Sequence, residues 1–272
     1  MSSGRALRFT LAAGDEALSE ARAEVPCSWA EAGAGLLSVW VDEDDAPQAR
    51  EALRGAGLSP REETLEPATD WVEAAAALRR PVAVGGYLLD PHAGRRAASP
   101  GGRRRLWLPA ARAFGTGSHE STRLALRLLL ASPLRGRTVL DVGCGAGPLA
   151  ILAALEGAAR VVAFDLDPDA AVATREHAAA NAAARVEAFA GGVEAISPAA
   201  SFDRIVANLL QEELSPILPS LRALAAPGAL LLTAGQLWAR EGEWTARLRS
   251  CGFAPERLAA EGEWLGVRAR AA

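Results

Sequence analysis

Apolar runs and amphipathic stretches alternate along the chain from residue 112 onward. Runs that are apolar throughout predict strands buried on both faces, and runs with a helical period predict helices. We expect a helix at 119–131, and later helices between strands at 138–143, 160–167, 186–191, 202–210 and 229–235. This alternation is typical of a parallel sheet that is covered by helices on both sides.

The end of the chain departs from this alternation. Residues 243–253 have helical periodicity, whereas 256–264 and 264–270 have the pattern of two strands joined by a tight turn. We therefore expect the sheet to end in an antiparallel hairpin.

The first part of the chain predicts a smaller α/β unit. Strand patterns occur at 6–12 and 35–44, and helical patterns at 15–25 and 45–58. The unit closes near residue 66, and an alanine-rich helical stretch then runs to Pro81. We expect three parts: a small α/β domain at 1–66, a linker helix at 67–80 and a large domain at 81–272.

Two further segments of strand composition, 82–91 and 103–110, flank a turn-rich stretch. This arrangement predicts a β-hairpin. Three arginines, Arg103, Arg104 and Arg105, stand beside the turn. They are expected to form a solvated edge in preference to an anion-binding patch.

Composition narrows the possible chemistry. The 272 residues include no lysine, which excludes a Schiff-base lysine and a phosphate-loop lysine from this chain. The net charge of −4 gives no reason to expect bulk attraction to nucleic acid. Cys27, Cys144 and Cys251 lie far apart, and the three histidines do not cluster with them. No disulfide framework and no metal site are therefore expected.

The amino-terminal segment has no signal-peptide core, and no apolar run reaches the roughly 18 residues of a membrane span. We therefore expect no membrane association and a cytoplasmic location.

The stretch VLDVGCGAG carries the strongest chemical signal. Its predicted strand ends at Asp141, and Gly143, Gly145 and Gly147 then turn into a helix. Glycines let the backbone approach a ligand closely, and the helix start offers free N–H groups. The next strand ends at Asp165, where a carboxylate can bind a ribose diol. The stretch therefore predicts a nucleoside-type cofactor.

Two cofactor classes use this spacing, nicotinamide dinucleotides and S-adenosylmethionine. The dinucleotide fingerprint is GxGxxG, whereas this loop is DxGxGxG. The acid before the first glycine, Asp141, suits a cationic amino group and sulfonium better than a pyrophosphate. The loop therefore favours S-adenosylmethionine over a nicotinamide-dependent oxidoreductase.

A third signal is Asn208, at the end of the strand in FDRIVANLL. Ligands of open α/β sheets bind at this end of the strands. An asparagine carbonyl there can accept a hydrogen bond from an amine and orient its lone pair. The alternative is an asparagine that makes a local turn.

The stretch RAFGTGSHESTRLALRLLL places a glycine turn ahead of an amphipathic helix. Thr116 or Ser118 is expected to cap that helix, which leaves a positive helix end for a carboxylate. His119 is either a ligand contact or a polar first-turn residue. Two other candidates are given structural roles: Cys144 as a small filler and His177 as a surface residue.

In this order, FGTGSHESTRLAL, VLDVGCGAG, FDLDP and VANLL resemble the PrmA family, the bacterial methyltransferases of ribosomal protein L11. The resemblance covers 112–272. It implies a class I methyltransferase fold, Rossmann-like with a mostly parallel seven-stranded sheet and a C-terminal antiparallel strand. It also implies a small N-terminal α/β domain that recruits the ribosomal protein.

The resemblance assigns S-adenosylmethionine binding to Thr122, Gly143, Asp165 and Asn208, to which the loop pattern adds Asp141 and Gly145. It also places Phe114, Gly115 and Thr116 along the approach to the cofactor and the substrate amine. The candidate catalytic residues are therefore Asn208, Phe114 and Thr116.

The expected reaction is methylation of lysine ε-amines, of an N-terminal α-amine, or of both, on ribosomal protein L11. The substrate would be free or ribosome-bound, with no nucleic acid required, and the enzyme a monomer. The alternatives are another protein lysine, as in electron-transfer flavoprotein methyltransferases, a small molecule, or a non-catalytic module that binds S-adenosylmethionine.

Overall fold

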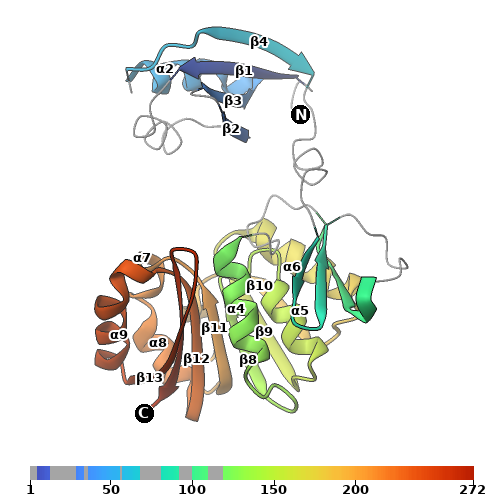
Figure 1. The fold of residues 1–272 in the computed structure, drawn as a ribbon, viewed down its shortest axis with the longest axis vertical. Helices are drawn as coiled ribbons and strands as arrows, with labels where there is room; N and C mark the ends of the chain where they lie inside the picture. Colours follow the sequence, from blue (N-terminus) through green and yellow to red (C-terminus); the bar gives the residue numbers. More distant parts are fainter. Residues whose placement is uncertain are drawn as a thin grey trace. The chain divides into compact units, whose positions relative to one another are not determined.

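The computed structural model describes residues 5–12, 29–33, 36–55, 57–67, 81–91, 100–109 and 119–272. The chain divides into two compact units, Met1–Ala75 and Ala76–Ala272 (Figure 1). The division falls within the predicted linker 67–80, of which only Pro67 is described. The three-part domain division therefore stays a prediction.

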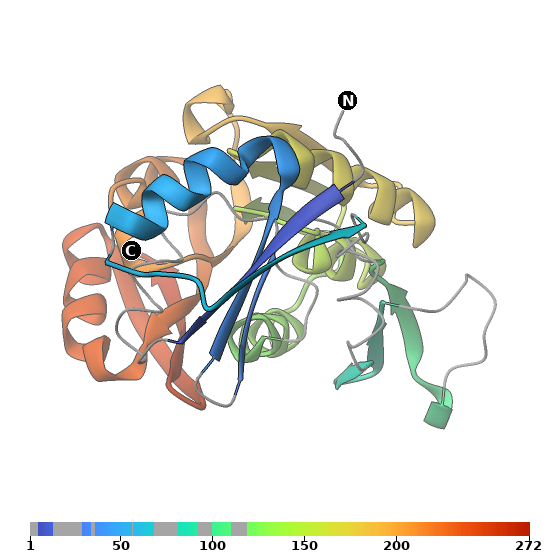
Figure 2. The same ribbon diagram turned by 90° about the horizontal axis from the view of Figure 1, so that it is seen from above.

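The first unit is an antiparallel sheet with the strand order β2-β3-β1-β4. Its elements are β1 (Arg5–Ala12), β2 (Trp29–Gly33), β3 (Leu36–Asp42), α2 (Ala46–Gly55) and β4 (Glu62–Pro67). Helix α2 lies along one face of the sheet (Figure 2), where Ala49 and Leu53 pack with Phe9 and Val41. Strands β2 and β4 were not predicted, and the predicted helix at 15–25 lies outside the described residues.

The second unit is built on a seven-stranded sheet with the order β10-β9-β8-β11-β12-β14-β13. Its strands are β8 (Thr138–Val142), β9 (Arg160–Asp165), β10 (Val186–Ala190), β11 (Phe202–Asn208), β12 (Ala225–Leu237), β13 (Phe253–Glu261) and β14 (Trp264–Ala271). Neighbours from β10 to β12 pair in parallel, whereas β14 is antiparallel to both β12 and β13. The predicted fold class and the terminal hairpin are confirmed.

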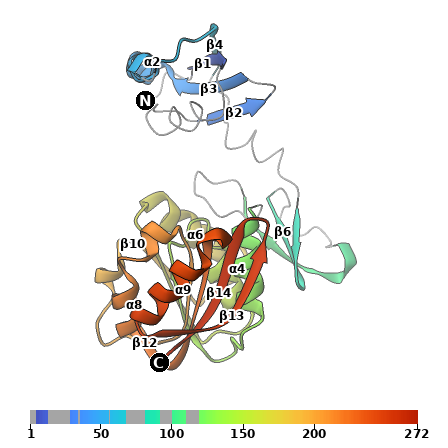
Figure 3. The same ribbon diagram turned by 60° about the vertical axis from the view of Figure 1, so that its left-hand side comes forward.

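Helices cover both faces of this sheet (Figures 1 and 3). They are α4 (Glu120–Leu130), α5 (Pro148–Leu155), α6 (Pro168–Ala180), α7 (Gln211–Leu214), α8 (Leu218–Leu224) and α9 (Glu241–Ser250). In β8, Val139 belongs to the core beneath α4 and α5, and the next residue, Leu140, belongs to the core beneath α8 and α9. Because side chains alternate along a strand, Asp141 points to the α4 and α5 side, as Val139 does.

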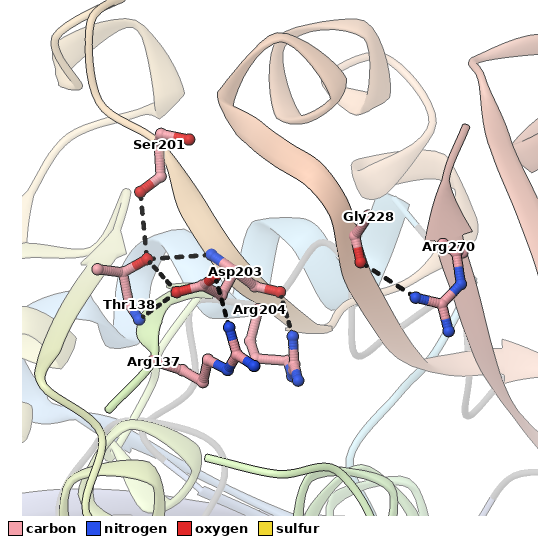
Figure 4. Close-up of polar contacts among 7 residues, drawn as sticks. All are labelled: Arg137, Thr138, Ser201, Asp203, Arg204, Gly228 and Arg270. Atoms are coloured by element: carbon pink, nitrogen blue, oxygen red, sulfur yellow. Dashed lines mark hydrogen bonds and ion pairs between the residues drawn. The ribbon is translucent and has the colours of Figure 1, made fainter. Parts of the chain in front are cut away.

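The amino-terminal ends of β8 and β11 are joined by a polar cluster (Figure 4). Asp203 Oδ2 accepts hydrogen bonds from the Thr138 N–H (2.9 Å) and hydroxyl (3.0 Å), and the Asp203 N–H donates back to Thr138 Oγ1 (3.0 Å). Arg137 pairs with the other carboxylate oxygen at 3.3 Å. These bonds fix the register of the two strands whose opposite ends carry Asp141 and Asn208.

A small sheet of β5 (Val82–Val84), β6 (Tyr87–Asp90) and β7 (Arg104–Trp107) also belongs to the second unit. The hairpin predicted between 82–91 and 103–110 is wrong. The hairpin turn lies at Gly85–Gly86, and β7 pairs in parallel with β6. The glycine pair makes a tighter turn than the long stretch that the prediction used.

Helix α4 lies against β14 at Gly266. A Cβ at this position would lie 2.8 Å from Leu124 Cγ and 2.9 Å from Leu128 Cδ1, both on α4. The missing side chain is therefore what lets the helix approach the sheet.

We expect Gly266→Ala to lower the free energy of unfolding by about 1–3 kcal/mol, because the added methyl group must push α4 outward. Gly242→Ala is the matched control, since Gly242 is exposed in α9 and an added Cβ meets nothing within 4 Å. The control should be neutral or stabilising by up to about 1 kcal/mol. Urea unfolding of both variants checks this, and equal effects would contradict the packing role.

Candidate functional site

The predicted site residues converge on the carboxyl edge of β8, β9 and β11. The glycine turn 143–147 follows β8, Asp165 is the last residue of β9, and Asn208 is the last residue of β11. The first turn of α4 brings Thr122 to the same place, because Asn208 Nδ2 donates a hydrogen bond to Thr122 Oγ1 at 3.2 Å. Four segments of the sequence thus meet at this edge.

The glycine turn is held by the neighbouring strand. The N–H groups of Gly143 and Cys144 both donate to the carbonyl oxygen of Phe164, at 2.9 and 3.0 Å, and the Gly145 N–H donates to Asp165 Oδ2 at 2.9 Å. Gly143 has φ +67°, and a Cβ there would lie 2.5 Å from Leu209 Cδ2. Its lack of a side chain lets the turn lie against the residue that follows Asn208.

Helix α6 holds the same turn from its other side. The Thr174 hydroxyl donates to the Gly145 carbonyl oxygen at 2.8 Å, and His177 Nδ1 lies 2.7 Å from the Ala146 carbonyl oxygen. Gly147 has φ +81°, and a Cβ there would lie 2.8 Å from Thr174 Oγ1. The prediction of a surface His177 is wrong: the ring is buried, and burial lowers its pKa. Because alanines lie on every side of α6, its sequence does not show which face of the helix is buried.

Asp165 is held by backbone donors on both oxygens. Oδ2 accepts from the Gly145 N–H, and Oδ1 accepts from the Asp167 N–H at 3.0 Å. A carboxylate has about four acceptor positions, so two further hydrogen bonds can be accepted. A fixed carboxylate of this kind suits a vicinal diol.

Asp141 lies beneath the turn and is fully buried. Its Oδ2 accepts a hydrogen bond from the Ala150 N–H of α5 at 2.9 Å, and Oδ1 has no hydrogen-bond partner among the described residues. Burial raises the pKa of this carboxyl to about 7, and the nearby Asp165 carboxylate acts in the same direction. The acid in the glycine pattern therefore fastens α5 to β8.

Asn208 has one satisfied and one unsatisfied side-chain atom. Its Nδ2 donates to Thr122 Oγ1, whereas Oδ1 is buried without a hydrogen-bond partner among the described residues. A buried carbonyl oxygen without a partner is costly in a folded protein, by about 1–3 kcal/mol. It is therefore the strongest indication of a ligand with an N–H or O–H donor at this edge.

The start of α4 is capped by His119. The ring Nδ1 accepts from the Ser121 N–H at 3.3 Å and lies 2.8 Å from Ser121 Oγ. The prediction that Thr116 or Ser118 caps the helix is therefore wrong, and His119 has a structural role at the first turn. Trp264 holds the ring in an edge-on contact, with the centroids 4.9 Å apart.

Glu261, which no sequence pattern singled out, ties the terminal hairpin to α4. Its Oε1 accepts from Arg123 Nε at 2.6 Å, and its Oε2 accepts from Arg127 NH1 at 2.7 Å. The adjoining turn residue, Gly262, lies against Glu120: a Cβ there would lie 2.3 Å from Glu120 Oε2. The hairpin turn therefore fixes the helix start that carries Thr122.

The remaining candidates are three residues that the structure does not describe and one cysteine that packs in the glycine turn. Phe114, Gly115 and Thr116 lie outside the described residues. Burial raises the pKa of the Cys144 thiol to about 12, which agrees with a filler role.

Within the described ranges no group of three or more His, Cys, Asp and Glu side chains could hold a metal ion. No helix in that part of the chain is long and apolar enough to cross a membrane.

Comparison with known proteins identifies similar chains. A family model described as ribosomal protein L11 methyltransferase (PrmA) matches residues 38–272. A ribosomal protein L11 methyltransferase of Sorangium cellulosum is 43% identical over 158 residues, 57% of this chain and 49% of that protein. The corresponding protein of Pseudomonas paraeruginosa is 40% identical over 158 residues, 58% of this chain and 53% of that protein. The chain thus spans about half the length of these relatives.

A solved structure of this kind is similar over nearly its whole length. The ribosomal protein L11 methylase of Lactobacillus delbrueckii subsp. bulgaricus aligns with a TM-score of 0.64 and 25% sequence identity, over 70% of this chain and 98% of that chain.

The buried Asp141 carboxyl predicts a pH dependence of stability. The ordinary pKa of this carboxyl, 3.8, holds in the unfolded chain, whereas burial raises the pKa to about 7 in the folded protein. Between these values the folded state holds a proton that the unfolded state has lost, so the free energy of unfolding falls as the pH rises. A difference of one between the folded and unfolded pKa values corresponds to about 1.4 kcal/mol in the free energy of unfolding.

Asp141→Asn should remove this contribution. Urea unfolding at pH 5 and at pH 8 should show the wild type losing more stability than the variant over that interval. The same change in both proteins would contradict a raised pKa for Asp141.

Glu261 forms partly buried ion pairs with two arginines. We expect these pairs to contribute more to the free energy of unfolding than an exposed ion pair does. Glu261→Gln should lower the free energy of unfolding by about 1 kcal/mol, because the side chain is 16% exposed and engages two guanidinium groups. The matched control is Glu187→Gln, whose pair with Arg160 is exposed on both sides and should contribute less than about 0.5 kcal/mol. Denaturant unfolding compares the two, and a larger loss in the control would overturn this ranking.

Proposed function

Because the chain belongs to the ribosomal protein L11 methyltransferase (PrmA) family, as the resemblance predicted, we propose that it transfers methyl groups from S-adenosylmethionine to amines of ribosomal protein L11. The observation that carries this proposal is the Asn208 amide, whose Nδ2 is fixed by Thr122 and whose buried Oδ1 has no partner among the described residues. Family membership counts against a nicotinamide-dependent oxidoreductase.

The residues at the carboxyl edge fit S-adenosylmethionine. The fixed Asp165 carboxylate can accept hydrogen bonds from the ribose diol, and Leu166 beside it is 79% exposed and offers an apolar surface to the base. Thr122 lies at the positive end of α4, which suits the carboxylate of the amino-acid part. Gly143 and Gly145 leave room for the ligand next to the backbone.

When bound, S-adenosylmethionine supplies a methyl group already activated by the sulfonium charge. The task of the protein is then to align a neutral amine with that methyl group. Asn208 does so by accepting an N–H of the amine on Oδ1, which directs the lone pair of the nitrogen. The hydrogen bond from Nδ2 to Thr122 Oγ1 holds the amide in the orientation that presents its oxygen.

The amine must lose a proton before it attacks, and a lysine ammonium has a pKa near ~10.4 in water. A partly apolar site disfavours the charged form and lowers that value. The amines proposed are lysine ε-amines, an N-terminal α-amine, or both. Phe114 and Thr116 are proposed to line the approach of the amine.

Roles are also proposed for the rest of the protein. The small N-terminal domain, 1–66, recruits the ribosomal protein, and the helix at 67–80 connects it to the methyltransferase domain. The protein acts in the cytoplasm as a monomer on free or ribosome-bound substrate, without requiring nucleic acid.

A transfer assay tests the proposed function. The protein is incubated with labelled S-adenosylmethionine and purified large-subunit ribosomal proteins, which are then separated. Label on L11 supports the proposal. Label on a different protein or a small molecule would move the assignment to one of the other methyltransferases, and cofactor binding without transfer would indicate a non-catalytic module.

Asn208→Ala should lower kcat by about 100-fold or more, because it removes an oriented acceptor that acts on the reacting amine. Binding of S-adenosylmethionine, measured by calorimetry, should weaken much less. Thr122→Val should also lower kcat, whereas Thr122→Ser keeps the hydroxyl acceptor and is the matched control. Equal losses of rate and cofactor affinity in Asn208→Ala would contradict the role given to Oδ1.

A further inference from the structure

Three large apolar side chains are exposed at the carboxyl edge next to Asn208. Leu210 is 50% exposed, Leu237 is 38% exposed and Trp238 is 47% exposed. They are three of the seven large hydrophobic side chains that are exposed in the described part of the chain. We call Leu210, Leu237 and Trp238 the edge patch.

The two segments that carry the edge patch are joined to each other. Gln236 Nε2 donates to the Leu209 carbonyl oxygen at 2.7 Å, and Gln211 Nε2 donates to Glu243 Oε1 at 2.6 Å. The backbone N–H of Trp238 donates to the Glu263 carbonyl oxygen at 2.8 Å. The exposed side chains therefore stand on ordered backbone.

The edge patch lies close to the methyl-transfer site. Asn208 on β11 pairs with Ala234 on β12, and the Leu209 N–H donates to the Ala234 carbonyl oxygen at 3.1 Å. Leu210 follows Asn208 by two residues, and Leu237 and Trp238 follow the paired strand. A polypeptide that places an amine at Asn208 can therefore contact the edge patch with its neighbouring residues.

Acidic residues are frequent in the segments that carry the edge patch. Five glutamates are carried by the same segments and the adjoining hairpin turn: Glu212, Glu213, Glu241, Glu243 and Glu263. The cation among them, Arg240, is shared between Glu212 and Glu243. Residues 210–213 and 238–243 together with Glu263 thus carry five glutamates and one arginine, a formal charge of −4.

We propose that the edge patch is the docking surface for the segment of the protein substrate that carries the accepted amine, and that this segment contains basic residues next to an apolar one. The apolar contact is made by Leu210, Leu237 and Trp238, and the glutamates attract the basic flanks. Charge complementarity selects this occupant, since the acidic rim repels an acidic chain. Tryptophan is also enriched among the residues that dominate binding energy at interfaces.

This inference rests on the proposed function, and its test uses a probe that requires no methyl transfer. The probe is a short fluorescein-labelled peptide in which lysines flank a leucine, and its counterpart has glutamates in place of the lysines. Fluorescence anisotropy at low ionic strength should show the full-length protein binding the lysine peptide more tightly, with a loss of affinity as salt is added.

Variants of the edge patch should weaken probe binding by about tenfold or more. The variants are Trp238→Ala and the charge reversal Glu263→Arg. Their matched controls are Leu258→Ala, an exposed leucine on β13, and Glu176→Arg, an exposed glutamate on α6. The controls should bind the probe as the wild type does.

With L11 as substrate, Trp238→Ala should raise KM and leave kcat unchanged. Equal binding of the two peptides, or equal affinity in the edge-patch variants and the controls, would overturn the docking surface. Preferential binding of the lysine peptide without transfer of label to L11 would leave the docking surface in place and refute the proposed function.

Discussion

The hydrogen bond from Asn208 Nδ2 to Thr122 Oγ1 is the interaction on which the site depends. It joins the last residue of β11 to the first turn of α4, two elements that are far apart in the sequence. Because the amide nitrogen is engaged, the amide oxygen must face the other way, and it is buried there without a partner among the described residues. A single bond thus turns an ordinary strand-end asparagine into an oriented acceptor for an amine.

The surrounding structure keeps the two partners of this bond in place. Gly266 lets α4 approach β14, and Glu261 ties the start of α4 to the terminal hairpin through Arg123 and Arg127. At the opposite edge, the cluster around Asp203 fixes the register of β11 against β8. The antiparallel hairpin at the chain end therefore supports the site, although it contributes none of the residues proposed to touch the cofactor.

The sequence predicted the features that depend on local pattern. Buried strands, the glycine turn and the ends of β8, β9 and β11 follow from periodicity and from glycine placement, and Asp141, Asp165 and Asn208 lie where the pattern put them. Features that depend on contacts between distant residues were missed. His177 faces the glycine turn and Glu261 reaches across to α4, and neither position is marked by its neighbours in the sequence. The predicted pairing of residues 82–91 with 103–110 was wrong because the sequence contains two possible turns. The shorter turn, at Gly85–Gly86, forms the hairpin between β5 and β6.

The proposed reaction requires that Asn208 Oδ1 accepts a hydrogen bond from the substrate amine while Nδ2 stays on Thr122. A crystal structure of the full-length protein with S-adenosylhomocysteine and a lysine-containing segment of L11 would show both contacts. We expect the amine nitrogen within about 3 Å of Oδ1 and the bond to Thr122 intact. An amine bound away from Asn208, or an amide that has turned its nitrogen toward the amine, would contradict the proposed role of Asn208.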